Sequence, residues 1–208
     1  MTRVESVNCA AATEDTIARR GMYRLLARLW IREVDRELLS QLQSAPILAS
    51  LEGAGGVVPS VDDSQAIEQL AIDYCRLFIG PSRHLPPYQS VWQDGQLLGD
   101  ASVSMQRYID AVGYDVDGLP TGVMLDHFGV QLDLMGFVLG HITRQSTEAI
   151  RQILIEEVAD DFFRAHLQWS VTMLEAIVIR ATTEFYRSTA LLTLAFLDCE
   201  GPEGRGSR

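Results

Sequence analysis

Residues 125–142 read LDHFGVQLDLMGFVLGHI, a long and regular apolar pattern. The apolar side chains are spaced alternately three and four positions apart, at Leu125, Phe128, Leu132, Met135, Leu139 and Ile142. Because an α-helix has about 3.6 residues per turn, this spacing places all of them along one side of a helix. The stretch therefore predicts a long helix whose apolar seam packs against neighbouring helices.

The same period continues through most of the chain. Stripes of helical spacing run through 22–30, 34–42 and 67–78, the last ending at Gly80-Pro81, and three more helices are expected between Thr147 and Cys199. A further helix is predicted from a cap at Asp100 to Gly113, and a short helix followed by a loop in 45–63. These patterns predict an all-α, compact multi-helix fold, with a single domain over residues 1–200 and a disordered tail at 201–208.

One long segment has no period. Residues 81–99, PSRHLPPYQSVWQDGQLLG, combine three prolines with large aromatic and imidazole side chains. An irregular segment of this length is usually functional or disordered, and its aromatic residues argue against disorder. Prolines and aromatic rings hold a peptide at a low entropic cost, so this loop is a candidate peptide-binding surface. Its candidate residues are Pro86, Pro87, Tyr88, Ser90 and Trp92. The alternative is that Tyr88 and Trp92 only fill the core.

The charged residues exclude several classes of protein. The 208 residues include 28 acids and 17 bases, all of them arginine, for a net charge of −11. Without lysine there is no Walker-type phosphate loop and no Schiff-base site. An acidic balance argues against nucleic-acid binding, because that affinity depends on neutralising phosphates. The same balance is compatible with a basic peptide partner, although many soluble proteins are simply acidic.

Cysteine usage and the absence of long apolar runs indicate the compartment. Cys9, Cys75 and Cys199 are too far apart in sequence for a disulfide framework or a zinc motif, and free thiols suit a reducing environment. Residues 1–20 lack the apolar segment of a secretory signal, and the apolar run at 191–197 is too short to span a bilayer. The sequence predicts a cytoplasmic protein.

The adjacent pair Asp126-His127 is the main candidate for site chemistry. Neighbours on a helix point about 100° apart, so the two do not form a dyad with each other. One interpretation is an N-terminus stabilised by the carboxylate, with His127 half-buried. The spacing of seven between His127 and His141 does not suit two ligands of one metal, and we find no nucleophile elbow near any histidine. A metal-dependent hydrolase centred on Asp126 and His127 therefore remains only the weakest alternative.

Several motifs together resemble one family. They are Tyr74-x-x-Leu77-Phe78-x-Gly80-Pro81, Pro86-Pro87-Tyr88-x-Ser90-Val91-Trp92, the acidic run from Asp126-His127 to Met135, Phe162-Phe163-x-x-His166-Leu167-x-Trp169, and Phe185-Tyr186. In this order they resemble the TorD/DmsD family of redox-enzyme maturation chaperones, over residues 17 to 198. The resemblance implies the family's all-helical fold, no catalytic site, and a monomer or a domain-swapped homodimer.

The resemblance also implies a function. Members bind the twin-arginine signal peptide and the apo form of a molybdenum-cofactor oxidoreductase, assist cofactor insertion and delay export. The chaperone itself would therefore contact the membrane translocase only indirectly. No resident cofactor is implied, although weak guanine nucleotide binding is reported for some members. The leader-binding residues carried over to this chain are Tyr23, Leu77, Phe78, Pro87, Trp92, Asp126 and His127. Asp126 would bind an arginine, between the apolar sides that the loop aromatics provide.

A second chaperone reading stays open. The chain is also compatible with an assembly factor for a reductase subunit that is not exported, as in the nitrate reductase chaperones of the same superfamily. Such a factor would bind a client terminus that lacks a functional export signal. The identity of the client enzyme does not follow from the sequence under either reading.

Overall fold

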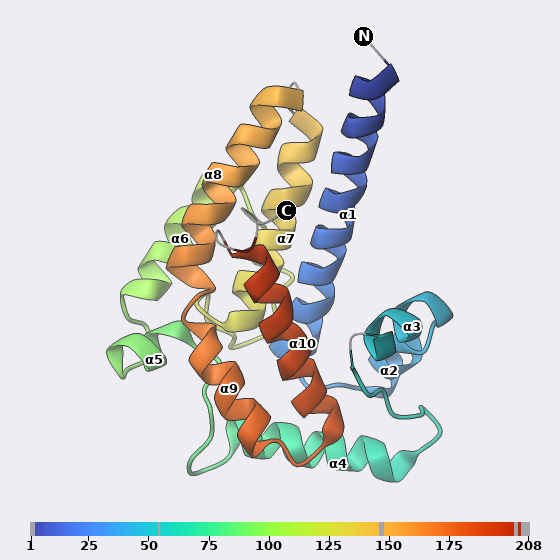
Figure 1. Ribbon diagram of the computed structural model, residues 1–208. Helices are drawn as coiled ribbons and strands as arrows, with labels where there is room; N and C mark the ends of the chain where they lie inside the picture. Colours follow the sequence, from blue (N-terminus) through green and yellow to red (C-terminus); the bar gives the residue numbers. More distant parts are fainter. Residues whose placement is uncertain (1–2, 54, 146–147, 202–203, 205–208) are drawn as a thin grey trace. The chain divides into compact units, whose positions relative to one another are not determined.

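The computed structural model describes residues 3–53, 55–145, 148–201 and 204, and their regular structure is helical (Figure 1). Side chains are described for 14–44, 47–49, 51–53, 55–140, 157–201 and 204. Within these residues the backbone pairs in β fashion at only one place, an isolated antiparallel bridge between Tyr88 and His127. The predicted all-α class is confirmed. The chain forms two compact units, each built from two separate segments.

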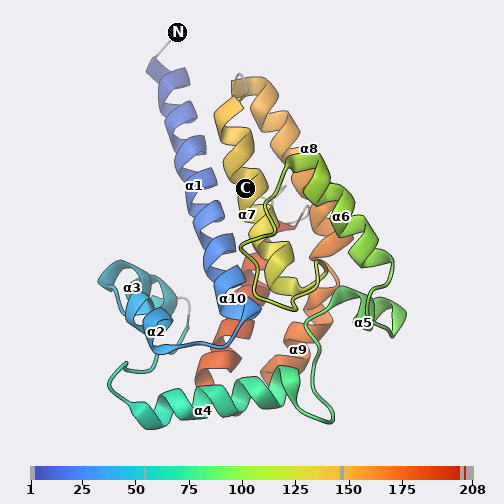
Figure 2. The same ribbon diagram turned by 180° about the vertical axis from the view of Figure 1, so that it is seen from behind.

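The first unit comprises Met1–Ile31 and Tyr88–Gln168. Its helices are α1 (Arg3–Ile31), α5 (Gln89–Asp94), α6 (Asp100–Val112), α7 (Phe128–Gln145) and α8 (Glu148–His166). Helix α7 packs against α1 on one side and α8 on the other (Figure 2). A Cβ atom on Gly129 would lie 2.7 Å from Ile31 Cβ and 2.9 Å from the Ile31 backbone, so glycine permits the close approach of α7 to the end of α1.

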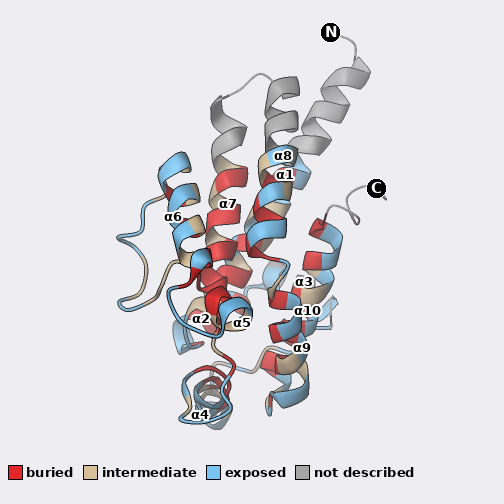
Figure 3. Ribbon diagram, turned by 90° about the vertical axis from the view of Figure 1, so that its left-hand side faces the viewer, coloured by how far each residue is buried: buried red, intermediate tan, exposed pale blue. Residues whose placement is uncertain are grey.

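The predicted apolar seam forms the core of this unit. Phe128, Leu132, Met135 and Leu139 have at most 1% of their surface exposed, and α7 is among the most buried helices in Figure 3. The rings of Phe128 and Trp30 of α1 lie 6.3 Å apart. Leu125 precedes the helix and is half-buried, and the side chain of Ile142 lies outside the described residues. The spacing of three and four thus identified a fully buried helix face, although Val130 and Leu134 on other sides of α7 are buried as well.

The second unit comprises Arg32–Pro87 and Trp169–Arg208. Its helices are α2 (Arg36–Leu42), α3 (Ala45–Gly53), α4 (Ser64–Tyr74), η1 (Cys75–Ile79), α9 (Ser170–Arg180) and α10 (Glu184–Glu200). Helix α10 packs against α9 and α4. An aromatic cluster joins α4 and η1 to α10: the ring of Tyr74 lies 4.9 Å from that of Phe78 and 6.1 Å from that of Tyr186.

A buried carboxylate fixes the start of α10 in the second unit. Asp73 of α4 has no exposed surface and accepts hydrogen bonds from the backbone N–H of Thr182 and of Thr183, and from the Thr183 hydroxyl, at 2.7–3.1 Å. Both threonines precede α10, and Thr183 is its N-cap, whose hydroxyl oxygen accepts from the N–H of Tyr186. The carboxylate thus pairs the backbone donors just before the helix and orients the capping hydroxyl. Asp73 therefore ties α4 to the N-terminus of α10.

The helix ends agree with the sequence predictions at some positions and correct them at others. Helix α6 ends at Gly113, which has φ +67, as a left-handed glycine C-cap. Its N-cap, however, is Gly99, and Asp100 is its first residue. The carboxylate of Asp100 therefore complements the positive end of the helix dipole instead of capping the helix. The segment 81–99 also contains a short helix, α5, which its lack of periodicity did not reveal.

The sequence predicts a single domain over residues 1–200, and this division remains a prediction. The two compact units described above do not by themselves decide whether they are separate domains. Apart from Gly201 and Gly204, the predicted tail at 201–208 lies outside the described residues. Among the helices that are described, none is both long enough and apolar enough to cross a membrane.

Candidate peptide-binding site

Two loops of the first unit meet where α5 and α7 begin. Tyr88 and His127 form the antiparallel bridge, and the N–H of Gln89 donates to the carbonyl of Asp126 at 3.1 Å. The Tyr88 ring meets the His127 ring edge to face, with centroids 5.1 Å apart. The structure thus brings together four of the predicted site residues: Tyr88, Ser90, Asp126 and His127.

Asp126 is buried with no exposed surface. Its Oδ2 accepts a hydrogen bond of 2.9 Å from the backbone N–H of Ser90, in the first turn of α5. Asp126 therefore stabilises the N-terminus of α5, and the expectation that it lies in the first turn of the long helix is wrong, because α7 begins only at Phe128. Within the described part of the chain, Asp126 Oδ1 and Ser90 Oγ are buried without a hydrogen-bond partner. This carboxylate retains unused acceptor capacity.

His127 starts α7 itself. Its Nδ1 accepts from the N–H of Gly129 at 3.0 Å, and its carbonyl accepts from Val130 and Gln131. A ring nitrogen that accepts a hydrogen bond carries no proton, so the imidazole is neutral with its proton on Nε2. Burial lowers the pKa of His127 to about 4, although the negative charge of Asp126 partly opposes this. The sequence predicts a half-buried His127, whereas the residue is only 3% exposed.

A buried polar network next to this pair escaped the sequence analysis. Gln89 donates from Nε2 to the Ala165 carbonyl at 2.6 Å, which fixes its amide orientation because a carbonyl can only accept. Its Oε1 then accepts from Gln131 at 2.6 Å and from His166 Nδ1 at 2.9 Å. His166 Nε2 is left to accept from the Ser104 hydroxyl at 3.0 Å.

The tautomer of His166 is therefore opposite to that of His127. Burial lowers the pKa of His166 to about 4 as well, against the nearby charge of Asp126. The network joins α5, α6, α7 and the end of α8. The only signal in the sequence was polar residues at otherwise apolar helix positions.

Three predicted residues present partial surface. Pro86, Tyr88 and Trp92 are half-exposed. Burial, and then the charge of Asp126, raise the pKa of the Tyr88 hydroxyl, so Tyr88 remains a neutral hydrogen-bonding group. Tyr88 and Trp92 are therefore only partly buried, and Tyr88 offers aromatic surface close to the buried carboxylate.

The remaining predicted residues lie in cores. Tyr23 of α1 is 1% exposed, in the first unit. Leu77 and Phe78 of η1 are 2% and 7% exposed in the second unit, and Pro87 is buried there. The boundary between the units falls between Pro87 and Tyr88, so the predicted set is divided between two bodies. The described contacts support a site around Asp126 and Tyr88 in the first unit.

Metal chemistry receives no support from the described residues. Nowhere among them do three or more histidine, cysteine, aspartate or glutamate side chains gather closely enough to hold a metal ion. Nδ1 of His127 already accepts a backbone hydrogen bond, so that nitrogen has no lone pair left for a metal. The side chain of His141 lies outside the described residues.

Comparison with known proteins gives the family. The sequence pattern of the nitrate reductase delta subunit family matches residues 34–175. This chain belongs to that family, which is the family of the TorD chaperones. The match includes every predicted site residue except Tyr23, and the resemblance noted in the sequence is confirmed.

Relatives of the family are similar over most of the chain. The chaperone protein TorD of Shewanella loihica is 26% identical, over 88% of this chain and 92% of its own length. The chaperone protein YcdY of Escherichia coli is 27% identical, over 86% of this chain and 76% of its own length. These relatives are named as chaperones, which is a non-enzymatic role.

A solved structure shares the fold. A crystal structure described as that of a redox enzyme maturation protein from Archaeoglobus fulgidus superposes with a TM-score of 0.53, over 86% of this chain and 93% of the other, at 19% identity. The TorD-like helical fold expected for this member of the family is therefore confirmed.

Proposed function

We propose that this protein is a non-catalytic maturation chaperone that binds the twin-arginine signal peptide and the apo form of a molybdenum-cofactor oxidoreductase. In this role it assists cofactor insertion and delays export until the client has folded. It acts in the cytoplasm, where exposed free thiols such as Cys75 and Cys199 stay reduced. It works as a monomer or a domain-swapped homodimer and meets the translocase only through its client.

One observation carries the proposal: the carboxylate of Asp126, with Oδ1 unpaired, lies beside the half-exposed ring of Tyr88. A twin-arginine leader joins guanidinium groups to an apolar stretch. A guanidinium binds a carboxylate through strong charge-assisted hydrogen bonds, and aromatic surface accepts the apolar stretch. In a family whose relatives are chaperones, this combination matches the leader better than it matches any substrate of an enzyme.

Binding requires a local opening. Because Asp126 is fully buried, a leader arginine reaches Oδ1 only if the contact between Tyr88 and His127 separates. That contact consists of an edge-to-face ring pair and an isolated β-bridge. It therefore has fewer interactions to break than a continuous β-ladder would have. The side-chain hydrogen bonds of Gln89, His166 and Ser104 involve neither Tyr88 nor His127, so opening this contact does not itself break them.

A second candidate function rests on the family match. The nitrate reductase delta subunit pattern covers residues 34–175, so an assembly factor for a reductase subunit that is not exported is the alternative. Such a factor would recognise a client without a twin-arginine motif. The two proposals differ in one feature, the need for the leader.

Co-purification separates them. We would co-express the tagged chaperone with a molybdoenzyme catalytic subunit from its own genome in three forms: intact, with the leader deleted, and with the two arginines replaced by lysines. The leader-chaperone proposal predicts strong capture of the intact client and loss of capture for both altered forms. Equal capture of all three would favour the assembly factor. Capture of none would contradict both.

A further inference from the structure

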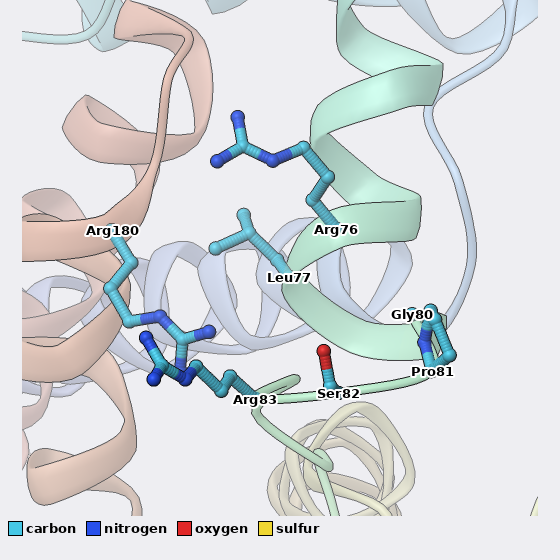
Figure 4. Close-up of a pocket in the computed structure, with 7 residues that line it drawn as sticks. All are labelled: Arg76, Leu77, Gly80, Pro81, Ser82, Arg83 and Arg180. Atoms are coloured by element: carbon cyan, nitrogen blue, oxygen red, sulfur yellow. The ribbon is translucent and has the colours of Figure 1, made fainter.

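A small pocket lies in the second unit, where the chain leaves η1. It is open to solvent, has a volume of about 250 Å³ and is lined by Arg76, Leu77, the Gly80-Pro81 turn, Ser82, Arg83 and Arg180. Figure 4 shows the side chains of Arg83 and Arg180 extending toward one another from the loop and from α9, whereas Arg76 extends away from them on the other side of Leu77. None of the residues attributed to leader binding lines it except Leu77.

Backbone hydrogen bonds hold the loop that forms this pocket. The N–H of Gly80 donates to the Cys75 carbonyl at 2.7 Å, which closes the π-helical turn, and the N–H of Leu85 donates to the Leu77 carbonyl at 2.6 Å. Between these bonds Arg83 adopts φ +57, a left-handed backbone that costs a non-glycine residue energy. Both features, a π-helical turn and a strained residue, recur at functional sites. Here they direct the Arg83 side chain into the pocket.

The charge of the pocket is unbalanced. No carboxylate lines it, and among the described residues none of Arg76, Arg83 and Arg180 has an ion-pair partner. The C-terminal ends of η1 and α9 contribute roughly −0.5 charge each, against the two full positive charges of the converging Arg83 and Arg180. About one positive charge therefore remains without compensation where Arg83 and Arg180 meet, and Arg76 adds a further charge elsewhere in the lining, in a chain whose net charge is −11.

We propose that this pocket binds the phosphoryl group of a small molecule. Arginine presents planar, forked N–H donors that match phosphate oxygens, and the Ser82 hydroxyl adds one more donor. The excess of positive charge favours an anionic ligand. The site does not depend on the proposed leader function, because the same charges repel the arginines of a leader. It gives the chaperone a second ligand, on a unit separate from Asp126.

Calorimetric titration with pyrophosphate tests the proposal. At low, matched ionic strength we expect a Kd below about 1 mM, weakened by added salt. Arg180→Gln and Arg83→Gln should each weaken binding by about tenfold or more, as expected for the loss of one charge-assisted hydrogen bond. Arg107→Gln is the matched control, because Arg107 is exposed on α6 and lies outside the pocket. It should change the affinity less than about twofold.

Two further arms keep the result unambiguous. Arg83→Gly removes the charge but suits the left-handed backbone, so this variant should fold at least as well as the wild type and still lose affinity. GDP distinguishes a nucleotide source from a simple phosphate, and citrate distinguishes phosphate from carboxylate chemistry. Absence of pyrophosphate binding, equal weakening in Arg107→Gln, or citrate binding as tightly as pyrophosphate would overturn the proposal.

Discussion

Lowering the pH from 7.5 to 5.0 should destabilise the protein through His127, which is 3% exposed. Its Nδ1 accepts the N–H of Gly129, so a proton on Nδ1 would replace this hydrogen bond with two donors facing each other. The pKa of this imidazole falls from 6.5 to about 4 on folding, first because of burial. Between these two values the unfolded chain binds more protons than the folded chain, so stability falls as the pH falls.

The size of this effect follows from the two pKa values. At pH 7.5 His127 is neutral in both the folded and the unfolded state, so its titration does not reduce the free energy of unfolding. At pH 5.0 the unfolded histidine is protonated and the folded one is not, which costs about 2 kcal/mol. The loss would approach about 3 kcal/mol below pH 4. His166, with its pKa also lowered to about 4, should add a loss of similar direction.

Urea unfolding followed by far-UV circular dichroism, at both pH values, measures the effect. His127→Asn is the informative variant, because an asparagine oxygen can accept the same N–H at the N-terminus of α7 but does not titrate. The loss between pH 7.5 and 5.0 should be smaller in this variant by about 2 kcal/mol. His84→Asn, at an exposed position, is the control and should lose as much as the wild type. Equal losses in His127→Asn and the wild type would refute the reasoning.

Three further predictions concern stability, each measurable by urea unfolding at pH 7.5. Asp73→Ala should cost about 3–4 kcal/mol, because it leaves the N–H groups at the start of α10 without their buried acceptor; a loss under about 1 kcal/mol would show that water replaces the carboxylate. Gly129→Ala should lower the free energy of unfolding by about 3 kcal/mol or more, because its Cβ would lie 2.9 Å from the Ile31 backbone. An unchanged stability would mean that α1 and α7 can move apart without cost. Leu98→Gly should stabilise the protein by about 1 kcal/mol, because Leu98 is 70% exposed at φ +60, whereas Leu97→Gly should not; the reverse order would contradict the strain.

The helices could be predicted because they rest on local patterns. Alternating spacings of three and four between Phe128 and Leu139 identified a fully buried face of α7, and Gly113 marked the end of α6 with a left-handed cap. Helix α5 escaped prediction because six residues are too few to show a period. Its N-terminus is stabilised from Asp126, 36 positions further along the chain, and no local signal reports such a contact.

The candidate site was predictable in residue type but not in geometry. The sequence identified Asp126, His127 and Tyr88, and the structure brings them together. It could not show that Asp126 is fully buried or that His127 starts α7, because both facts depend on how loops far apart in sequence pair. The network around Gln89 and His166 and the arginine pocket were likewise invisible, since their members come from different helices.

Calorimetric titration of the purified protein with a twin-arginine leader peptide, beside a twin-lysine control, tests the central claim most directly. We predict a Kd of about 1 μM or tighter for the twin-arginine leader, weakened about tenfold or more by the lysine substitutions. Asp126→Ala should weaken the same interaction by about 1.5–3 kcal/mol, because it removes the carboxylate that receives the guanidinium group. Equal affinity for the two peptides, or no binding to several different leaders, would contradict the claim that this chain is a leader-binding chaperone.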